Sequence, residues 1–146
     1  MDRNATFETF GGADTLVCDY VHWSVQARPK QVTLGAMVIL SHSQAFSFSS
    51  LPPEAFAELS EVVTDVEATT ARLFAPAKMN YLMLMMVDPH VHFHVLPRYS
   101  VPAVFEGASY PDPGWPGQPN LGASEGLANA AQVTRALREA WRSSRA

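Results

Sequence analysis

The chain has 146 residues, of which 47% are hydrophobic and 16% are charged, a balance typical of one folded globular domain over residues 1–146. The formal net charge of −4 excludes the broad positive field with which proteins hold nucleic acid non-specifically. The longest strongly apolar run, residues 81–87, is far shorter than the ~20 residues of a membrane helix. Cys18 is the only cysteine, so no internal disulfide can form. We therefore expect a cytoplasmic protein that binds neither bulk nucleic acid nor a membrane.

The first half of the chain predicts two strands and a helix. Residues 20–28 alternate between apolar and polar side chains, as in a half-buried strand, and residues 32–40 form a β-branched apolar run typical of the next strand. Gly35 inside this run indicates a bulge or a close backbone approach. A serine-rich connection over residues 41–50 leads to a helix that begins at Pro53 and ends before Pro76, with apolar residues at three- and four-residue spacing.

The second half predicts a hairpin, a long loop and a closing helix. Two apolar runs, residues 78–87 and 91–99, are separated by the turn-forming pair Asp88-Pro89 and predict an antiparallel hairpin at the centre of the sheet. Prolines and glycines then crowd residues 100–122, which favours a loop, and residues 124–145 predict a helix. This order of elements predicts an α+β domain with its core over about residues 15–100 and its helices on one face of an antiparallel sheet.

Three of the five histidines stand at alternate positions: His90, His92 and His94. In a strand, residues i, i+2 and i+4 share a face, so the three imidazoles project together while the apolar residues between them face the core. A slip of one residue would bury all three imidazoles, so their orientation is strongly specified. One histidine alone would be an ordinary polar residue on a solvent face. A row of three interleaved with apolar residues favours a functional site.

The row suits an elongated anion better than a metal ion. Neutral imidazole is a common zinc ligand, but the Cα atoms of His90 and His94 in a strand lie roughly 13 Å apart, and Asp88 is the only carboxylate nearby. We therefore expect no metal and no cofactor. A di- or polyphosphate fits the row, with the central imidazole of His92 attacking phosphorus and its neighbours polarising phosphoryl oxygens. Attack requires that one nitrogen of His92 be held by an acceptor, so that the other presents its lone pair.

The segment HVHFHVL, residues 90–96, resembles the motif of the histidine triad (HIT) superfamily, His-φ-His-φ-His-φ-φ with φ apolar. Weaker similarity extends over residues 28–35, 53–74 and 78–81, so that the resemblance covers half to two-thirds of the chain. It implies an α+β fold, a homodimer, and hydrolysis or transfer of nucleotidyl groups attached to phosphate, amine or similar leaving groups. It also implies that His92 is the nucleophile, that His94 contacts the phosphate and that His90 orients the site.

Two further residues are candidates for substrate binding. Arg28 stands where relatives often have an Asn that contacts ribose or phosphate, and a guanidinium can bind phosphate bidentately. Asn80 matches an Asn that is common before the triad. The face of the sheet on which Asn80 lies depends on the length of the hairpin loop, so both orientations are open.

Departures from the motif favour two alternative functions. Gly35-Ala36 stands where many members have Gly-His, and Met85-Met86 where relatives often have Gly-Asn. These changes suggest a nucleotide-binding regulatory module with negligible turnover as the first alternative. A histidine-rich metal-binding protein is the second. No role is assigned to His22 or His42.

Overall fold

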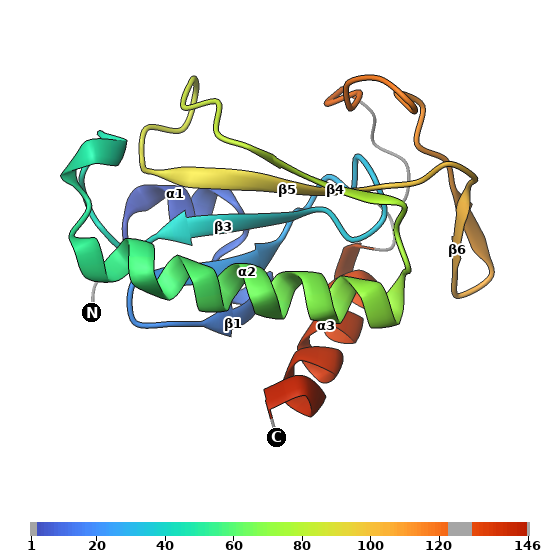
Figure 1. The fold of residues 1–146 in the computed structure, drawn as a ribbon, viewed down its shortest axis with the longest axis horizontal. Helices are drawn as coiled ribbons and strands as arrows, with labels where there is room; N and C mark the ends of the chain where they lie inside the picture. The colour runs from blue at the N-terminus through green and yellow to red at the C-terminus, as the bar shows by residue number, and fades with distance from the viewer. Residues whose placement is uncertain (1–2, 123–129, 146) are drawn as a thin grey trace.

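The computed structural model describes residues 3–122 and 130–145, and its centre is a five-stranded antiparallel sheet in the order β1-β2-β3-β5-β4 (Figure 1). The strands are β1 (Leu16–Asp19), β2 (Trp23–Ala27), β3 (Met37–Ser41), β4 (Lys78–Leu82) and β5 (His92–Arg98). The helices are α1 (Ala5–Thr9), α2 (Pro53–Leu73) and α3 (Ala130–Arg145). Two 3₁₀ turns, η1 (Gly12–Asp14) and η2 (Phe48–Ser50), and a separate hairpin of β6 (Ala103–Phe105) and β7 (Ala108–Tyr110) complete the chain.

The main core lies between one face of the sheet and the helices α2 and α3. Trp23 and Val25 of β2 face this core, and the indole Nε1 of Trp23 donates a hydrogen bond to the Ala55 carbonyl of α2 at 2.7 Å. Val62 and Val66, four residues apart on α2, are fully buried against the sheet, as the helical spacing in the sequence predicts. The α+β class is therefore confirmed.

The opposite face of the sheet is covered by α1, which the sequence analysis did not predict. Phe7 and Phe10 pack there against Val38 and Leu40 of β3, in a smaller apolar cluster separate from the main core. The two predicted helices, α2 and α3, share one face as expected, and α1 is an additional helix on the other face. The short α1 is a single turn and a half, and two apolar residues do not make a periodic pattern that can be read from sequence.

The connection between β4 and β5 is longer than the predicted hairpin turn. β4 ends at Leu82, β5 begins at His92, and residues 83–91 form a loop in which Leu84, Met86 and Val87 are exposed. β5 lies between β3 and β4, whereas β4 is an edge strand. The predicted central position is right for β5 and wrong for β4, because apolar residues in this segment continue into an exposed loop instead of marking a buried strand.

Gly35 makes the close approach that the sequence predicts. Its φ is +84°, and a Cβ atom at this position would lie 2.8 Å from the ring of Phe74 at the end of α2. Both the left-handed backbone and the contact require glycine. The turn that contains Gly35 delays the next strand, so β3 begins at Met37 and not at residue 32.

The predicted loop over residues 100–122 contains the β6–β7 hairpin, and a buried ion pair fastens it to the sheet. The Arg98 Nε of β5 donates to the Asp112 carboxylate at 2.7 Å, with side-chain exposures of 4% and 0%. Its Nη1 donates to the Asn80 side-chain oxygen at 2.7 Å, and the Tyr99 backbone N–H donates to Asp112 at 3.1 Å. One carboxylate therefore holds the end of β5, and Arg98 links it to β4.

The predicted C-terminal helix is described from Ala130 onward, as α3, while residues 124–129 lie outside the described residues. Among the residues that the structure describes, no helix is long and apolar enough to cross a membrane.

The buried ion pair generates a stability prediction. Replacing Asp112 by Asn leaves the Arg98 guanidinium buried without its counter-charge, which typically destabilises a protein by about 3–5 kcal/mol. We expect a loss of this size in the free energy of unfolding measured by urea denaturation. The control is Glu106→Gln on the exposed β6–β7 turn, which should change stability by less than about 0.5 kcal/mol. Equal stabilities for the two variants would contradict this role of the pair.

Candidate functional site

The structure brings the three histidines to one end of the sheet, on the face opposite the main core. His92 and His94 of β5 lie opposite Leu40 and Val38 of β3, and their ring centroids are 5.0 Å apart with the rings nearly perpendicular. His90 precedes the strand by two residues, so the prediction of three histidines within one strand is correct only for His92 and His94. All three side chains are buried, with exposures of 5%, 2% and 9% for His90, His92 and His94.

Backbone geometry fixes the tautomer of the neutral central imidazole. The Nδ1 atom of His92 lies 2.6 Å from the carbonyl oxygen of His90. A carbonyl can only accept a hydrogen bond, so Nδ1 carries the proton and donates it. The lone pair is then on Nε2, the nitrogen that points away from this contact. The acceptor that the sequence analysis required for nucleophilic attack is thus supplied by the first histidine of the motif.

The two flanking imidazoles are held neutral by their surroundings. Burial, with smaller contributions from Arg28 and His92, lowers the pKa of His94 to about 4. Burial also lowers the pKa of His90, with a smaller contribution from His92. The His90 Nδ1 is within 2.8 Å of the Thr6 hydroxyl of α1. At neutral pH, His90 and His94 are therefore hydrogen-bonding groups without charge.

One nitrogen of the site has no hydrogen-bond partner among the described residues. The Nδ1 atom of His94 is buried and unpaired. An unsatisfied buried polar atom costs roughly 1–3 kcal/mol, and a bound water or ligand that pairs with it recovers this cost. This nitrogen marks His94 as a group prepared for a polar ligand.

Arg28 lies beside the triad at the end of β2. Its charge acts on His94, its Nη1 donates to the Lys30 carbonyl at 3.3 Å, and its buried Nε has no hydrogen-bond partner among the described residues. Burial lowers the pKa of Arg28, and the charge of Asp88 partly offsets this. Arg28 and Lys30 line a cavity of about 230 Å³ together with Thr9 and Phe10 of α1.

Asn80 lies on the triad face, because it pairs with Leu96, two positions along β5 from His94. This answers the question that the hairpin length left open. The side-chain oxygen of Asn80, however, accepts the hydrogen bond from Arg98 at 2.7 Å. The structure thus directs this amide oxygen toward the Arg98–Asp112 pair and not toward the imidazoles.

Aromatic and hydroxyl side chains outside the motif complete the site, and the sequence analysis missed them. The Phe10 ring of α1 lies 5.7 Å from the His92 ring and 6.0 Å from the His94 ring, and Phe46 lies 5.1 Å from His90. A local signal for α1 was present in the sequence. Asn4 is a favoured N-cap residue, and its side chain accepts from the Phe7 backbone N–H at 3.3 Å.

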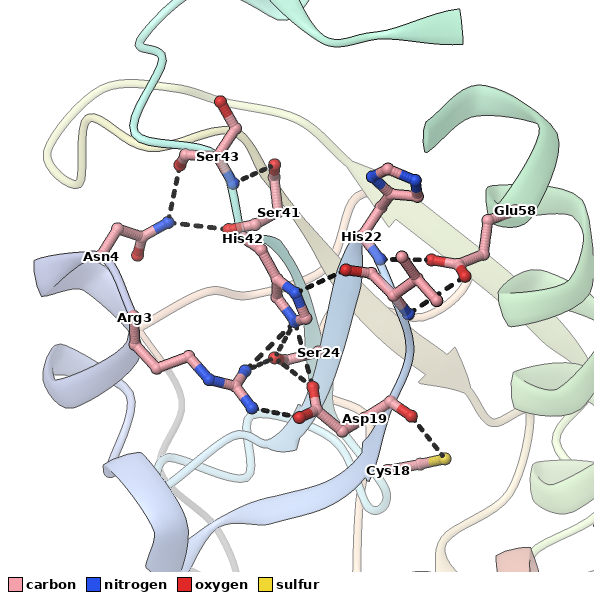
Figure 2. Close-up of polar contacts among 11 residues, drawn as sticks. Arg3, Asn4, Cys18, Asp19, His22, Ser24, Ser41, His42, Ser43 and Glu58 are labelled. Atoms are coloured by element: carbon pink, nitrogen blue, oxygen red, sulfur yellow. Dashed lines mark hydrogen bonds and ion pairs between the residues drawn. The ribbon is translucent and has the colours of Figure 1, made fainter. Parts of the chain in front are cut away.

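His42, which received no role from sequence, belongs to a polar cluster beside the site (Figure 2). Its Nε2 lies 3.0 Å from the Asp19 carboxylate and 2.9 Å from the Ser24 hydroxyl, and its Nδ1 lies 2.9 Å from the Val21 carbonyl. Arg3 joins the same cluster through Asp19 and Ser24. Within residues 3–122 and 130–145, no group of three or more His, Cys, Asp or Glu side chains is arranged to hold a metal ion.

The fold and the site together define a class. An antiparallel α+β domain with neighbouring imidazoles at the start of a central strand, the middle one oriented by the first, is the architecture of a histidine triad protein. The HIT domain family model matches residues 19–101, which is more than half of the chain. The chain therefore belongs to the HIT family.

Solved structures of low sequence identity share this fold. A histidine triad protein from Sinorhizobium meliloti superposes with a TM-score of 0.70 at 18% identity, covering 94% of this chain and 95% of that one. A histidine triad nucleotide-binding protein from Sulfolobus tokodaii gives 0.65 at 16% identity, over 88% and 84% of the two chains. A zinc-bound histidine triad protein from Mycobacterium smegmatis gives 0.64 at 15% identity, over 97% and 92%. No curated protein matches the sequence.

The lowered pKa of His94 predicts a pH dependence of stability. Between the ordinary histidine value near 6.5 and about 4, the unfolded chain binds a proton that folded His94 does not, so the stability of the fold decreases as pH falls through this window. In the variant His94→Asn, this contribution is absent. We expect its unfolding free energy, measured by urea denaturation, to fall less between pH 7 and pH 5 than that of the wild type. Parallel pH profiles would contradict the lowered pKa.

Proposed function

We propose that this chain is a nucleotidyl hydrolase or transferase that works through a covalent nucleotidyl intermediate on His92. The observation that carries this proposal is the 2.6 Å contact between His92 Nδ1 and the His90 carbonyl, which in the neutral ring puts the lone pair on Nε2. Membership of the HIT family supports nucleotide chemistry in general. The substrate would be a nucleoside phosphate ester, anhydride or phosphoramidate.

The reaction proceeds in two displacements. The Nε2 lone pair of His92 attacks the phosphorus atom bonded to the nucleoside, a P–N bond forms, and the leaving group departs with the electron pair of its own bond to phosphorus. Water or another acceptor hydroxyl then attacks the same phosphorus and gives up its proton to solvent, which balances the proton taken up by the leaving group. The P–N bond breaks, and its electron pair returns to Nε2, which restores the starting imidazole.

The neighbouring residues stabilise the charge that develops on the phosphoryl oxygens. Neutral His94 donates from one ring nitrogen, and Arg28 beside it supplies a positive charge. His90 acts through its carbonyl on His92, so it is a positioning residue. Asn80 contributes to substrate binding only through an exchange of its Arg98 contact for the ligand. A nucleotide substrate is consistent with the cytoplasmic location expected from the sequence.

A regulatory module that binds nucleotide with negligible turnover is the second candidate. Ala36 favours it, because this residue is fully buried with Val32 and Leu96 and brings no imidazole to the site. A metal-binding protein is the third, and the zinc-bound relative from Mycobacterium smegmatis is its support. A panel of adenylyl donors separates the three. Product release supports the enzyme, saturable binding without product supports the module, and stoichiometric zinc uptake supports the metal site.

The covalent step predicts a specific mutational result. On mixing with an adenylyl donor and acid quenching, the wild-type protein should carry one nucleotidyl group on His92, identified by mass spectrometry of peptides. His92→Asn should lose this adduct and at least about a hundredfold in kcat, because no other group replaces the nucleophile. His22→Asn, outside the triad, serves as the matched control and should retain both. Turnover by His92→Asn at the wild-type rate would contradict the proposal.

We also propose that the chain forms a homodimer through the edge of the sheet. β4 is an edge strand with one unpaired side, and it continues into a loop with the exposed residues Leu84, Met86 and Val87. Unpaired strand edges and clustered exposed apolar side chains favour association. Sedimentation equilibrium should give twice the mass of one chain. A single-chain mass at micromolar concentration would contradict the dimer.

A further inference from the structure

The triad is closed off from solvent by the short helix α1. His92 is 2% exposed, whereas attack on phosphorus requires its Nε2 to come within about 3–3.5 Å of a ligand atom. The ring of Phe10 packs on both His92 and His94, and Thr6 contacts His90. A nucleotide can reach the imidazoles only if these α1 side chains move away.

The helix that forms this cover is short, and apart from its two N-terminal polar residues it is held by hydrogen bonds from Gln26 and Thr15 to the carbonyls of Phe7 and Phe10. It has five residues, and it is joined through Phe10 and Gly11 to η1, whose first residue is Gly12; the φ angles of Gly11 and Gly12 are +102° and +58°. Its apolar contacts with the sheet come mainly from Phe7 and Phe10, against Val38 and Leu40. A small apolar contact area and a glycine pair at one end favour local opening over unfolding of the domain.

The other end of α1 is held by a polar latch formed by Arg3 and Asn4 (Figure 2). The Asn4 side-chain amide donates to the Ser41 carbonyl at 2.7 Å and to the Ser43 carbonyl at 2.9 Å. The Arg3 guanidinium forms an ion pair with Asp19, donates to Ser24, and lies 3.1 Å from the His42 ring. The two latch residues thus tie the start of α1 to the ends of β1 and β3.

The ion pair of the latch is more accessible than the structural ion pair of the same protein. Arg3 and Asp19 are 26% and 40% exposed at their side chains, against 4% and 0% for Arg98 and Asp112. A partly exposed ion pair contributes little stability, because water and salt compete for both charges. The Arg3–Asp19 pair therefore holds α1 weakly enough to release, while the Arg98–Asp112 pair keeps the sheet intact.

We propose that α1 is a latched lid over the triad, and that release of the Arg3 and Asn4 contacts withdraws Phe10 and admits the nucleotide to His92. The inference rests on the proposed function for the identity of what enters. In the closed state Thr6 positions the His90 ring, and this contact is lost on opening. The apparent affinity for nucleotide is then the intrinsic affinity multiplied by the fraction of molecules that are open.

Chemical modification tests the lid without any enzymatic activity. The full-length protein is treated with diethyl pyrocarbonate, and the rate of modification of each histidine is followed by mass spectrometry. In Arg3→Gln and Asn4→Ala, we expect the rates at His92 and His94 to rise roughly fivefold, which corresponds to an open fraction raised from about 10% to about 50%. Glu8→Gln, which removes a charge from the exposed side of the same helix, is the control and should leave the rates unchanged.

Selective exposure separates lid opening from loss of the fold. A variant that unfolds loses its helical circular dichroism signal as the triad becomes reactive, whereas an opened lid raises the rates at His92 and His94 and leaves both that signal and the rate at His22 unchanged. Equal triad rates in the wild type, Arg3→Gln and Asn4→Ala would overturn the lid. Wild-type modification rates at His92 and His94 as high as the rate at His22 would also overturn the lid.

The kinetics of nucleotide capture distinguish a failed lid from a failed function. If the proposed function holds, Arg3→Gln should raise kcat/KM at low concentrations of an adenylyl donor by a factor similar to the rise in modification rate. If the modification rates at His92 and His94 rise selectively but no variant carries a nucleotidyl group on His92, the proposed function is overturned. The lid is still supported by that result. Nucleotidylation at wild-type rates in both latch variants, with unchanged modification, would overturn the lid alone.

Discussion

The hydrogen bond from His92 Nδ1 to the His90 carbonyl is the interaction on which the site depends. It is made within the motif itself, between residues two apart, and it joins the extended start of β5 to the end of the 83–91 loop. Pairing of β5 with β3 enforces this extension from Leu40 to Met37. The buried ion pair of Arg98 holds the other end of the same strand. The backbone of His92 is therefore held by the sheet, whereas the carbonyl that orients its ring belongs to the last residues of the 83–91 loop.

Burial keeps the flanking imidazoles of the site neutral. Neutral His90 and His94 cost less to bury than charged imidazoles, and this is reflected in their lowered pKa values. The same burial separates the nucleophile from the nucleotide it is proposed to attack. Buried neutral imidazoles must be shielded from water, yet a charged substrate has to reach them. Both conditions are met if the segment that covers the imidazoles can move. In the present structure α1 occupies that place, with Phe10 against two of the three rings.

Sequence reasoning succeeded where a pattern is enforced locally. The alternation in β2, the helical spacing in α2 and the interleaved His92 and His94 each follow from which side chains face the core. The orientation of Asn80 could not be predicted, because it depends on the nine-residue loop before His92, and apolar side chains do not reveal that this loop leaves the sheet. The Arg98–Asp112 pair and the contact of Thr6 with His90 join residues distant in sequence, so neither leaves a local signature.

The most direct test of the central claim is the tautomer of His92, measured by long-range ¹H–¹⁵N correlation NMR on the ¹⁵N-labelled protein near neutral pH. The account predicts that Nδ1 of His92 carries the proton and that Nε2 gives the signal of an unprotonated nitrogen. A His92 ring protonated at Nε2, with an unprotonated Nδ1, would contradict it, because the lone pair would then face the His90 carbonyl and no nucleophile would face a substrate.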